Sequence, residues 1–141
     1  MSVIEGYEHF EVEADVGVRA WAPTLAAAFA QTALGVFALV VPPEDVTVRE
    51  TREVRAQGEG LETLLVSWIN ECLYVHEIEG FAVHQVIVTS EPGAFVHGEL
   101  HGEPIDSERH RLGTVVKAAT LHGVAVISSP GHHETRLVVD V

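Results

Sequence analysis

Basic residues and cysteines are scarce in this sequence, and each shortage excludes a class of function. Lys and Arg together number 8 against 21 Asp and Glu, so the formal net charge is −13. Proteins that bind nucleic acid draw affinity from clustered Lys and Arg that neutralise phosphates, and this chain has no run of basic residues. Its one cysteine, Cys72, has no second cysteine for an intramolecular disulfide or a cysteine-based zinc site. The composition therefore disfavours direct nucleic-acid binding and favours a cationic metal or a basic patch on a partner protein.

Signals for secretion and membrane insertion are also missing. The N-terminus lacks the basic start and the apolar segment of a signal peptide. Residues 24–41 form a stretch of 18 residues without a charge, close to the length of a membrane span. However, this stretch contains Gln31 and Gly35 and is bracketed by Pro23 and Pro42. We therefore expect a buried amphipathic helix, no membrane span and a cytoplasmic location.

Familiar catalytic and metal-binding motifs are absent as well. The Gly-Glu-Gly at 58–60 is not followed by Lys and Ser or Thr, as a phosphate-binding loop would be. No serine has the Gly-x-Ser-x-Gly setting of a hydrolase. His97, Glu99 and His101 share one face of an expected strand. Because a strand rises about 3.3 Å per residue, however, His97 and His101 lie about 13 Å apart. One metal ion cannot bridge that distance, so an exposed polar strand face is favoured.

The hydrophobic pattern predicts two helices and about seven strands. One helix is expected over residues 25–40 with Thr24 as its N-cap, and a second from residue 61 to just before Gly80. Cys72 lies on the apolar face of the second helix, which indicates core packing. Strands are expected twice within 7–22 and at 46–56, 81–89, 94–101, 114–127 and 134–141. These elements predict an α+β fold, a two-layer sandwich with two helices on one face of a mixed or antiparallel sheet, in a single domain over residues 1–141.

The C-terminus offers a candidate metal site. Asp140 directly precedes Val141, so a side-chain carboxylate and the terminal carboxylate lie one residue apart at the end of an expected strand. Calcium and magnesium take oxygen ligands of this kind, and Asp15, which precedes another apolar strand, is a candidate third ligand. In the alternative interpretation, Asp140 is a solvent-facing strand residue and Asp15 caps a turn.

Residues 102–122 form the second concentration of polar residues. Lys117 lies in the middle of an expected apolar strand, where it needs an exposed face or a carboxylate partner because burying an unpaired charge is costly. Glu103 is a candidate partner, and His110 and His122 lie in the same stretch. Alternatively, this is an edge strand protected from aggregation by a lysine.

Several motifs together resemble the archease family along essentially the whole chain. Their order, spacing and presence at both termini make the joint match specific, although each motif alone is weak. The motifs are Ala14-Asp15-Val16-Gly17-Val18, Ser67-Trp68-Ile69-Asn70-Glu71-Cys72-Leu73-Tyr74, Gly102-Glu103-Pro104 with His110, Val116-Lys117-Ala118-Ala119-Thr120-Leu121-His122, and Val139-Asp140-Val141.

The resemblance implies a function. Archeases are accessory proteins of the GTP-dependent RNA ligase of the RtcB type, which seals tRNA halves and broken RNA. They help the ligase to form its covalent guanylate intermediate and to turn over repeatedly. The resemblance further implies a two-layer α+β domain and a site for a divalent metal (calcium, magnesium or manganese). By the same resemblance, the metal ligands are Asp15, Asp140 and the terminal carboxylate of Val141, with Glu103, His110, Lys117 and His122 as supporting residues.

The sequence departs from the family at one place, and one alternative function stays open. The family usually has His-Thr before Ala-Asp, whereas this chain has Val12 and Glu13. Glu13 adds a carboxylate, and alternation along an extended segment would put it on the same side as Asp15. The alternative function is a free-standing metal-dependent enzyme that acts on a small phosphorylated substrate. The missing nucleophile, phosphate loop and basic pocket favour a non-catalytic accessory protein.

Overall fold

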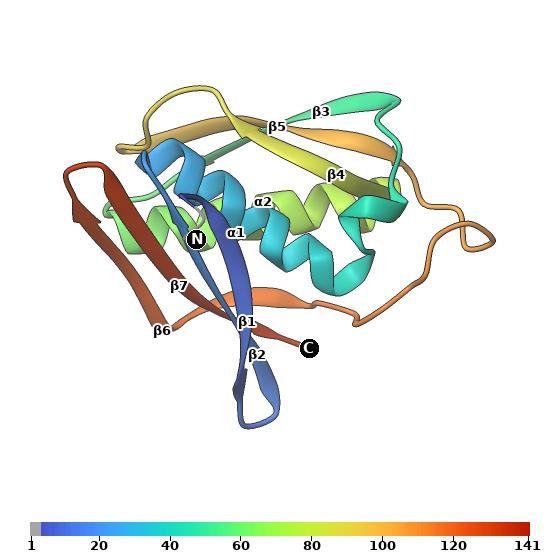
Figure 1. Cartoon of the computed structure of the whole chain (residues 1–141), viewed down its shortest axis with the longest axis horizontal. Helices are drawn as coiled ribbons and strands as arrows, with labels where there is room; N and C mark the ends of the chain where they lie inside the picture. The colour runs from blue at the N-terminus through green and yellow to red at the C-terminus, as the bar shows by residue number, and fades with distance from the viewer. Residues whose placement is uncertain (1–3) are drawn as a thin grey trace.

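Seven strands and two long helices make up the computed structural model, which describes residues 4–141 (Figure 1). In chain order the elements are β1 (Gly6–Val12), β2 (Asp15–Ala22), α1 (Leu25–Val40), the short 3-10 helix η1 (Pro43–Asp45), β3 (Glu50–Gln57), α2 (Leu61–Glu79), β4 (Phe81–Val88), β5 (Phe95–Pro104), β6 (Ala118–Ser129) and β7 (His132–Asp140). The α+β class and both helices are thus confirmed.

The strands divide between two antiparallel sheets, and the helices lie between them. The first sheet has the order β1-β2-β7-β6 and the second β3-β5-β4. Helix α1 packs against β2 and β7 on one side and β4 on the other, while α2 packs against β6 and β3. Figure 1 shows both helices in this middle layer. The sequence predicted helices on one face of a single sheet, so the arrangement of the layers differs from that expectation.

The composition of α1 explains why it can occupy a middle layer. Its 16 residues include no charged side chain, and its buried positions lie around most of its circumference. A helix that is apolar all round is stable only when its surroundings cover it on every side. Two sheets provide that cover, which accounts for the uncharged stretch at 24–41. Among the described residues, no helix is long and apolar enough to cross a membrane.

Both helices begin or end where the sequence predicted. The Thr24 hydroxyl accepts a hydrogen bond from the Ala27 N–H at 3.1 Å and so caps the start of α1. Gly80 follows α2 in the left-handed conformation, with φ 59°. A side chain at that φ would be strained, which explains a glycine at the helix end.

The core joins both sheets to the helix layer. Trp68 of α2 is fully buried and donates its indole N–H to the Phe29 carbonyl of α1 at 3.1 Å. Gly98 of β5 lies so close beneath Trp68 that an added Cβ would be 2.5 Å from the ring. Cys72 is buried in the same core, and burial raises the pKa of its thiol well above its ordinary value. The prediction that Cys72 is a core residue is therefore confirmed.

The segment 105–117 has no regular structure apart from a short turn, although the sequence predicted a strand from residue 114. It runs from β5 in one sheet to β6 in the other, past the helix layer (Figure 1). The N–H groups of Gly113 and Thr114 donate to the carbonyls of Val40 and Leu39, at 2.8 and 2.7 Å. The last carbonyls of a helix have no partner within the helix. The segment therefore bonds the end of α1 instead of a neighbouring strand.

Candidate functional site

Asp15 and Asp140 lie at matching ends of two paired strands. Strand β2 begins at Asp15, β7 ends at Asp140, and their antiparallel register pairs Val16 with Val139. Continuing this register by one residue places Asp15 opposite Asp140. Residues opposite each other project from the same face of a sheet, with Cβ atoms about 4.5–5.5 Å apart. Because Val139 projects into the core, both carboxylates project from the face turned away from the helices.

The end of the chain is held in place beside these carboxylates. Asp140 pairs with Ala118 of β6, and its carbonyl accepts a hydrogen bond from the Lys117 N–H at 2.8 Å. The Val141 side chain is half-buried and packs against the core. Asp140 and Val141 are therefore held against β6 and the core at the end of β7. Figure 1 shows the β1–β2 hairpin, which carries Asp15, projecting from the body of the molecule on the same side.

The donor set at this end of the sheet consists of carboxylate oxygens. Calcium, magnesium and manganese prefer such hard oxygen ligands. Across residues 4–141, no three His, Cys, Asp or Glu side chains lie close enough together to hold a metal ion. Asp15 and Asp140 are therefore not part of such a group of three side chains.

Glu13 lies in a turn rather than in an extended segment. Strand β1 ends at Val12 and β2 begins at Asp15, so Glu13 and Ala14 form a two-residue hairpin loop. Glu13 has φ 46°, which is typical of the first position in such tight turns. The alternation argument that put Glu13 beside Asp15 is therefore wrong, because the chain reverses direction at this residue.

Glu103 forms a buried ion-pair cluster of its own. Its side chain is 1 % exposed, and one carboxylate oxygen accepts the Thr47 N–H at 2.7 Å and His110 Nε2 at 3.0 Å. The other oxygen contacts the Arg109 guanidinium and lies 3.5 Å from Arg49 Nε. Burial by itself would raise the pKa of Glu103, but the bonds from Thr47, His110 and Arg109 outweigh it and lower the pKa from 4.5 to about 2.

The hydrogen bonds of His110 determine its protonated nitrogen. The side chain is buried, and its Nδ1 accepts the Asp106 backbone N–H at 2.9 Å. Nδ1 therefore carries no proton, and the proton on Nε2 is the one donated to Glu103. The cluster ties residues 106–110 to β5 and to the chain before β3.

Lys117 and His122 lie apart from this cluster. Glu103 pairs with Arg109, Arg49 and His110, so the expected partnership between Glu103 and Lys117 is wrong. Within residues 4–141 the Lys117 side chain is exposed and makes no ion pair, while its backbone bonds Asp140. His122 is exposed in a bulge of β6, where the pairing with β7 shifts register between Thr120 and Ala125. Lys117 is therefore near the carboxylates, whereas no contact brings His122 to them.

Asn70 is a site-forming residue that residue patterns did not single out. Its amide oxygen accepts the Ala119 N–H at 2.7 Å, and its amide nitrogen donates to the Ala119 carbonyl at 3.3 Å. These two hydrogen bonds fix the start of β6 on α2. They thereby position Lys117 and the pairing of β6 with Asp140. The available signal was a polar amide in the middle of a helix, at a half-buried position.

Comparison with known proteins decides the family. A family model described as the archease protein family (MTH1598/TM1083) matches residues 7–141. This chain belongs to the archease family. It is 34 % identical over 139 residues to the protein archease of Pyrococcus abyssi, covering 96 % of this chain and 98 % of the relative. The archease of Thermococcus gammatolerans is 39 % identical over 127 residues, covering 88 % and 89 %.

Solved structures agree with the archease fold. The solution structure of protein 1598 from Methanobacterium thermoautotrophicum superposes with a TM-score of 0.77 and 29 % identity, covering 96 % of this chain and 99 % of that one. The crystal structure of an archease from Thermotoga maritima superposes with a TM-score of 0.60 and 17 % identity, covering 95 % and 96 %. At that identity the second similarity concerns the fold alone.

Proposed function

We propose that this archease is a non-catalytic accessory protein that activates a GTP-dependent RNA ligase of the RtcB type. In this proposal it promotes guanylylation and repeated turnover of the ligase during tRNA splicing and RNA repair. The observation that carries the proposal is the family membership over residues 7–141. The register of β2 and β7, which brings the carboxylates of the family motif together, supports it.

The carboxylates give the proposal a chemical basis. Asp15, Asp140 and the Val141 terminus would hold a divalent ion, either calcium, magnesium or manganese. When bound, that ion would offset the repulsion between the carboxylates and offer a positive charge to a ligand of the partner. Lys117, whose backbone N–H bonds the Asp140 carbonyl, would add a second positive charge at this end of the sheet. Two paired strands hold the carboxylates in a fixed geometry without a flexible loop.

Charge and the state of the thiol support a protein partner and a non-catalytic role. With a net charge of −13, the chain repels RNA phosphates and suits the basic surface that an RNA-binding enzyme needs. Cys72 cannot serve as a nucleophile, because it is buried and its raised pKa keeps the thiol protonated. We further propose that the chain works as one domain in the cytoplasm.

One feature favours the alternative function, a free-standing metal-dependent enzyme acting on a small phosphorylated substrate. Arg49 and Arg109 line a shallow hollow of about 580 Å³ above Glu103, and guanidinium groups bind phosphate well. Both guanidinium groups already share the Glu103 carboxylate, however, and Arg109 also lies 3.6 Å from Asp106. Their positive charge is therefore largely neutralised, which makes this alternative the weaker one.

A ligation assay tests the proposal. We expect substoichiometric archease to raise multiple-turnover ligation by the cognate ligase, and Asp140→Asn to lose most of this stimulation. Glu62→Gln, at an exposed position in the first turn of α2, is the control and should stimulate normally. Tight binding of tRNA without the ligase, or turnover of a phosphoester by the archease alone, would contradict the accessory role.

A further inference from the structure

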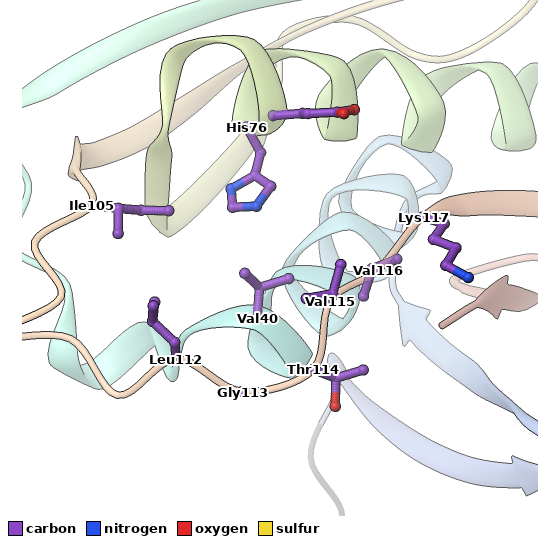
Figure 2. A pocket seen from close by; sticks show the side chains of 10 residues that line it. Val40, His76, Ile105, Leu112, Gly113, Thr114, Val115, Val116 and Lys117 are labelled. Atoms are coloured by element: carbon purple, nitrogen blue, oxygen red, sulfur yellow. The ribbon is translucent and has the colours of Figure 1, made fainter.

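A half-open apolar cavity lies between the ends of both helices and the segment 105–117. Its volume is about 380 Å³, within the range of specific binding sites. Figure 2 shows the side chains that surround it. They are Val40, His76, Glu77, Ile105, Leu112, Gly113, Thr114, Val115, Val116 and Lys117.

The lining of the cavity is mostly aliphatic, with Glu77, Thr114 and Lys117 as further polar residues beside His76. His76 Nδ1 lies 2.9 Å from the Phe81 carbonyl, and because a carbonyl only accepts, Nδ1 carries the proton. His76 Nε2 is then left as an acceptor. In Figure 2 the imidazole points from α2 toward Val40, into the cavity, whereas the Lys117 ammonium points away from it. An occupant would thus be mainly apolar, with room for a donor that faces His76.

The outer wall of the cavity is exposed but rigid. Leu112 is 58 % exposed and Val115, three positions further along the chain, is 76 % exposed, so two large apolar side chains face solvent at the same cavity. The backbone between them is fixed to the end of α1 by the bonds from Gly113 and Thr114. The apolar surface is therefore already formed before anything binds, which lowers the entropic cost of docking.

Charge selects among the possible occupants. A second copy of this chain also carries −13, and Glu77 at the rim would face like charge. A small apolar molecule inside the cavity would leave Leu112 and Val115 uncovered. A basic protein segment with one apolar anchor side chain satisfies both the apolar cavity and the negative net charge of the chain.

We propose that this cavity is the docking site for an apolar anchor residue in a basic segment of the ligase, an inference that rests on the proposed function. The cavity wall and the carboxylate site share one stretch of chain, because Lys117 lines the cavity and its N–H bonds the Asp140 carbonyl. An anchor in the cavity would therefore hold the ligase beside Asp15, Asp140 and the Val141 terminus.

The experiment measures the affinity of labelled archease for the ligase by titration. Leu112→Asp and Val115→Asp alter exposed side chains and should fold, yet each should weaken binding by about tenfold or more. Glu77→Lys should weaken it as well, and affinity should fall as ionic strength rises. Ile127→Asp is the matched control: Ile127 is 57 % exposed on β6 and does not line the cavity, so its variant should bind within about twofold of wild type.

The outcomes separate this inference from the proposed function. If wild-type archease neither binds the ligase nor stimulates it, both proposals are wrong. If it binds and stimulates, but both cavity variants bind as tightly as Ile127→Asp, the docking site alone is wrong. Affinity that does not change with ionic strength would overturn the basic character assigned to the anchor segment. Far-ultraviolet circular dichroism of each variant, unchanged from wild type, confirms that lost binding is not lost folding.

Discussion

Glu103 shows how a single buried charge organises this protein. Taking a carboxylate out of water costs several kcal/mol unless its oxygens are bonded. Here both oxygens have partners, from Thr47 in the chain before β3 and from Arg109 and His110 in the segment after β5. One side chain thus connects β5 to the segment that follows it and to Thr47, which lies 56 positions away in sequence.

The depressed pKa of Glu103 makes stability depend on pH in a defined direction. Because the pKa is about 2 in the folded protein and 4.5 in the unfolded one, the carboxylate stabilises the fold fully above about pH 4.5. This contribution, on the order of 3 kcal/mol, is lost as pH falls from 4.5 toward 2. Glu103→Gln should therefore be less stable than wild type at pH 7, by about 2–4 kcal/mol. Urea unfolding of both proteins at pH 7, 4.5 and 3 measures the difference.

The difference between the two proteins should narrow as pH falls. A constant difference across that range would mean that Glu103 acts through its shape and hydrogen bonds rather than its charge. Glu99→Gln on the outer face of β5 is a suitable control, because this residue is partly exposed and its ion pair within residues 4–141 is with His101 alone. It should change stability by less than about 1 kcal/mol.

Sequence patterns flagged Glu103 and His110 but assigned the wrong partner. For Lys117, placed in an expected apolar strand, an exposed face and a carboxylate partner were both open, with Glu103 as the candidate partner. In the structure Lys117 precedes β6 and is exposed, so it needs no carboxylate. The actual partners, Arg49 and Arg109, lie in irregular segments, where no periodicity indicates the direction of a side chain.

At the scale of elements, Asn70 connects α2 to β6. Both of its amide groups bond the backbone of Ala119, which is the second residue of β6. Apolar packing between a strand and a helix is not directional, whereas these two hydrogen bonds require a defined position of Ala119 relative to Asn70. It fixes how far β6 extends along α2 and therefore where the preceding segment leaves the sheet.

Removing the Asn70 amide should loosen β6 at its start. Asn70→Ala leaves the Ala119 N–H and carbonyl without their partner, which costs about 1–3 kcal/mol. We expect lower stability in urea and faster hydrogen exchange at Ala119, while amides in the second sheet keep their protection. Glu71→Ala, at the exposed neighbouring position, is the control. Equal exchange at Ala119 in both variants would show that the apolar packing of β6 suffices.

The strengths and failures of the sequence analysis also appear at this scale. Helix ends were predictable because Thr24 and Gly80 satisfy local requirements of their own backbone. The strand expected over 114–127 is present as β6 but begins at Ala118, because Thr114, Val115 and Val116 are β-branched and mimic a strand without pairing as one. Whether such a run pairs with a strand or with a helix end depends on tertiary neighbours.

At the scale of the molecule, the arrangement of two sheets around a helix layer was not readable from periodicity. Alternation reports that a strand has one buried face, but not which sheet the strand joins. Strands β2 and β7 pair although the paired residues Val16 and Val139 are 123 positions apart in sequence. That pairing brings Asp15 to Asp140, so the candidate site followed from motif positions and from family resemblance, not from local pattern.

A test of the carboxylate site involves the whole fold, because its three groups come from both ends of the chain. Carboxylates held close together repel one another, and a divalent cation removes that penalty in the folded state only. With calcium, magnesium or manganese at about 100 times Kd, the folded state gains about 2.7 kcal/mol, and the melting temperature should rise by on the order of 10 °C. Asp140→Asn and Asp15→Asn should each reduce this rise.

The chain end gives this prediction its sharpest control. Amidation or extension of the C-terminus changes no side chain, yet it removes or displaces the Val141 carboxylate and should reduce the rise as much as Asp140→Asn does. Asp45→Asn alters an aspartate that pairs with Arg111 in a different part of the molecule, and it should leave the rise intact. Melting curves recorded with and without each metal measure all of these proteins. If the melting temperatures of wild type and of all the altered proteins respond identically to metal, no metal binds between these strand ends. The paired carboxylates then serve only to keep an exposed sheet end charged and solvated.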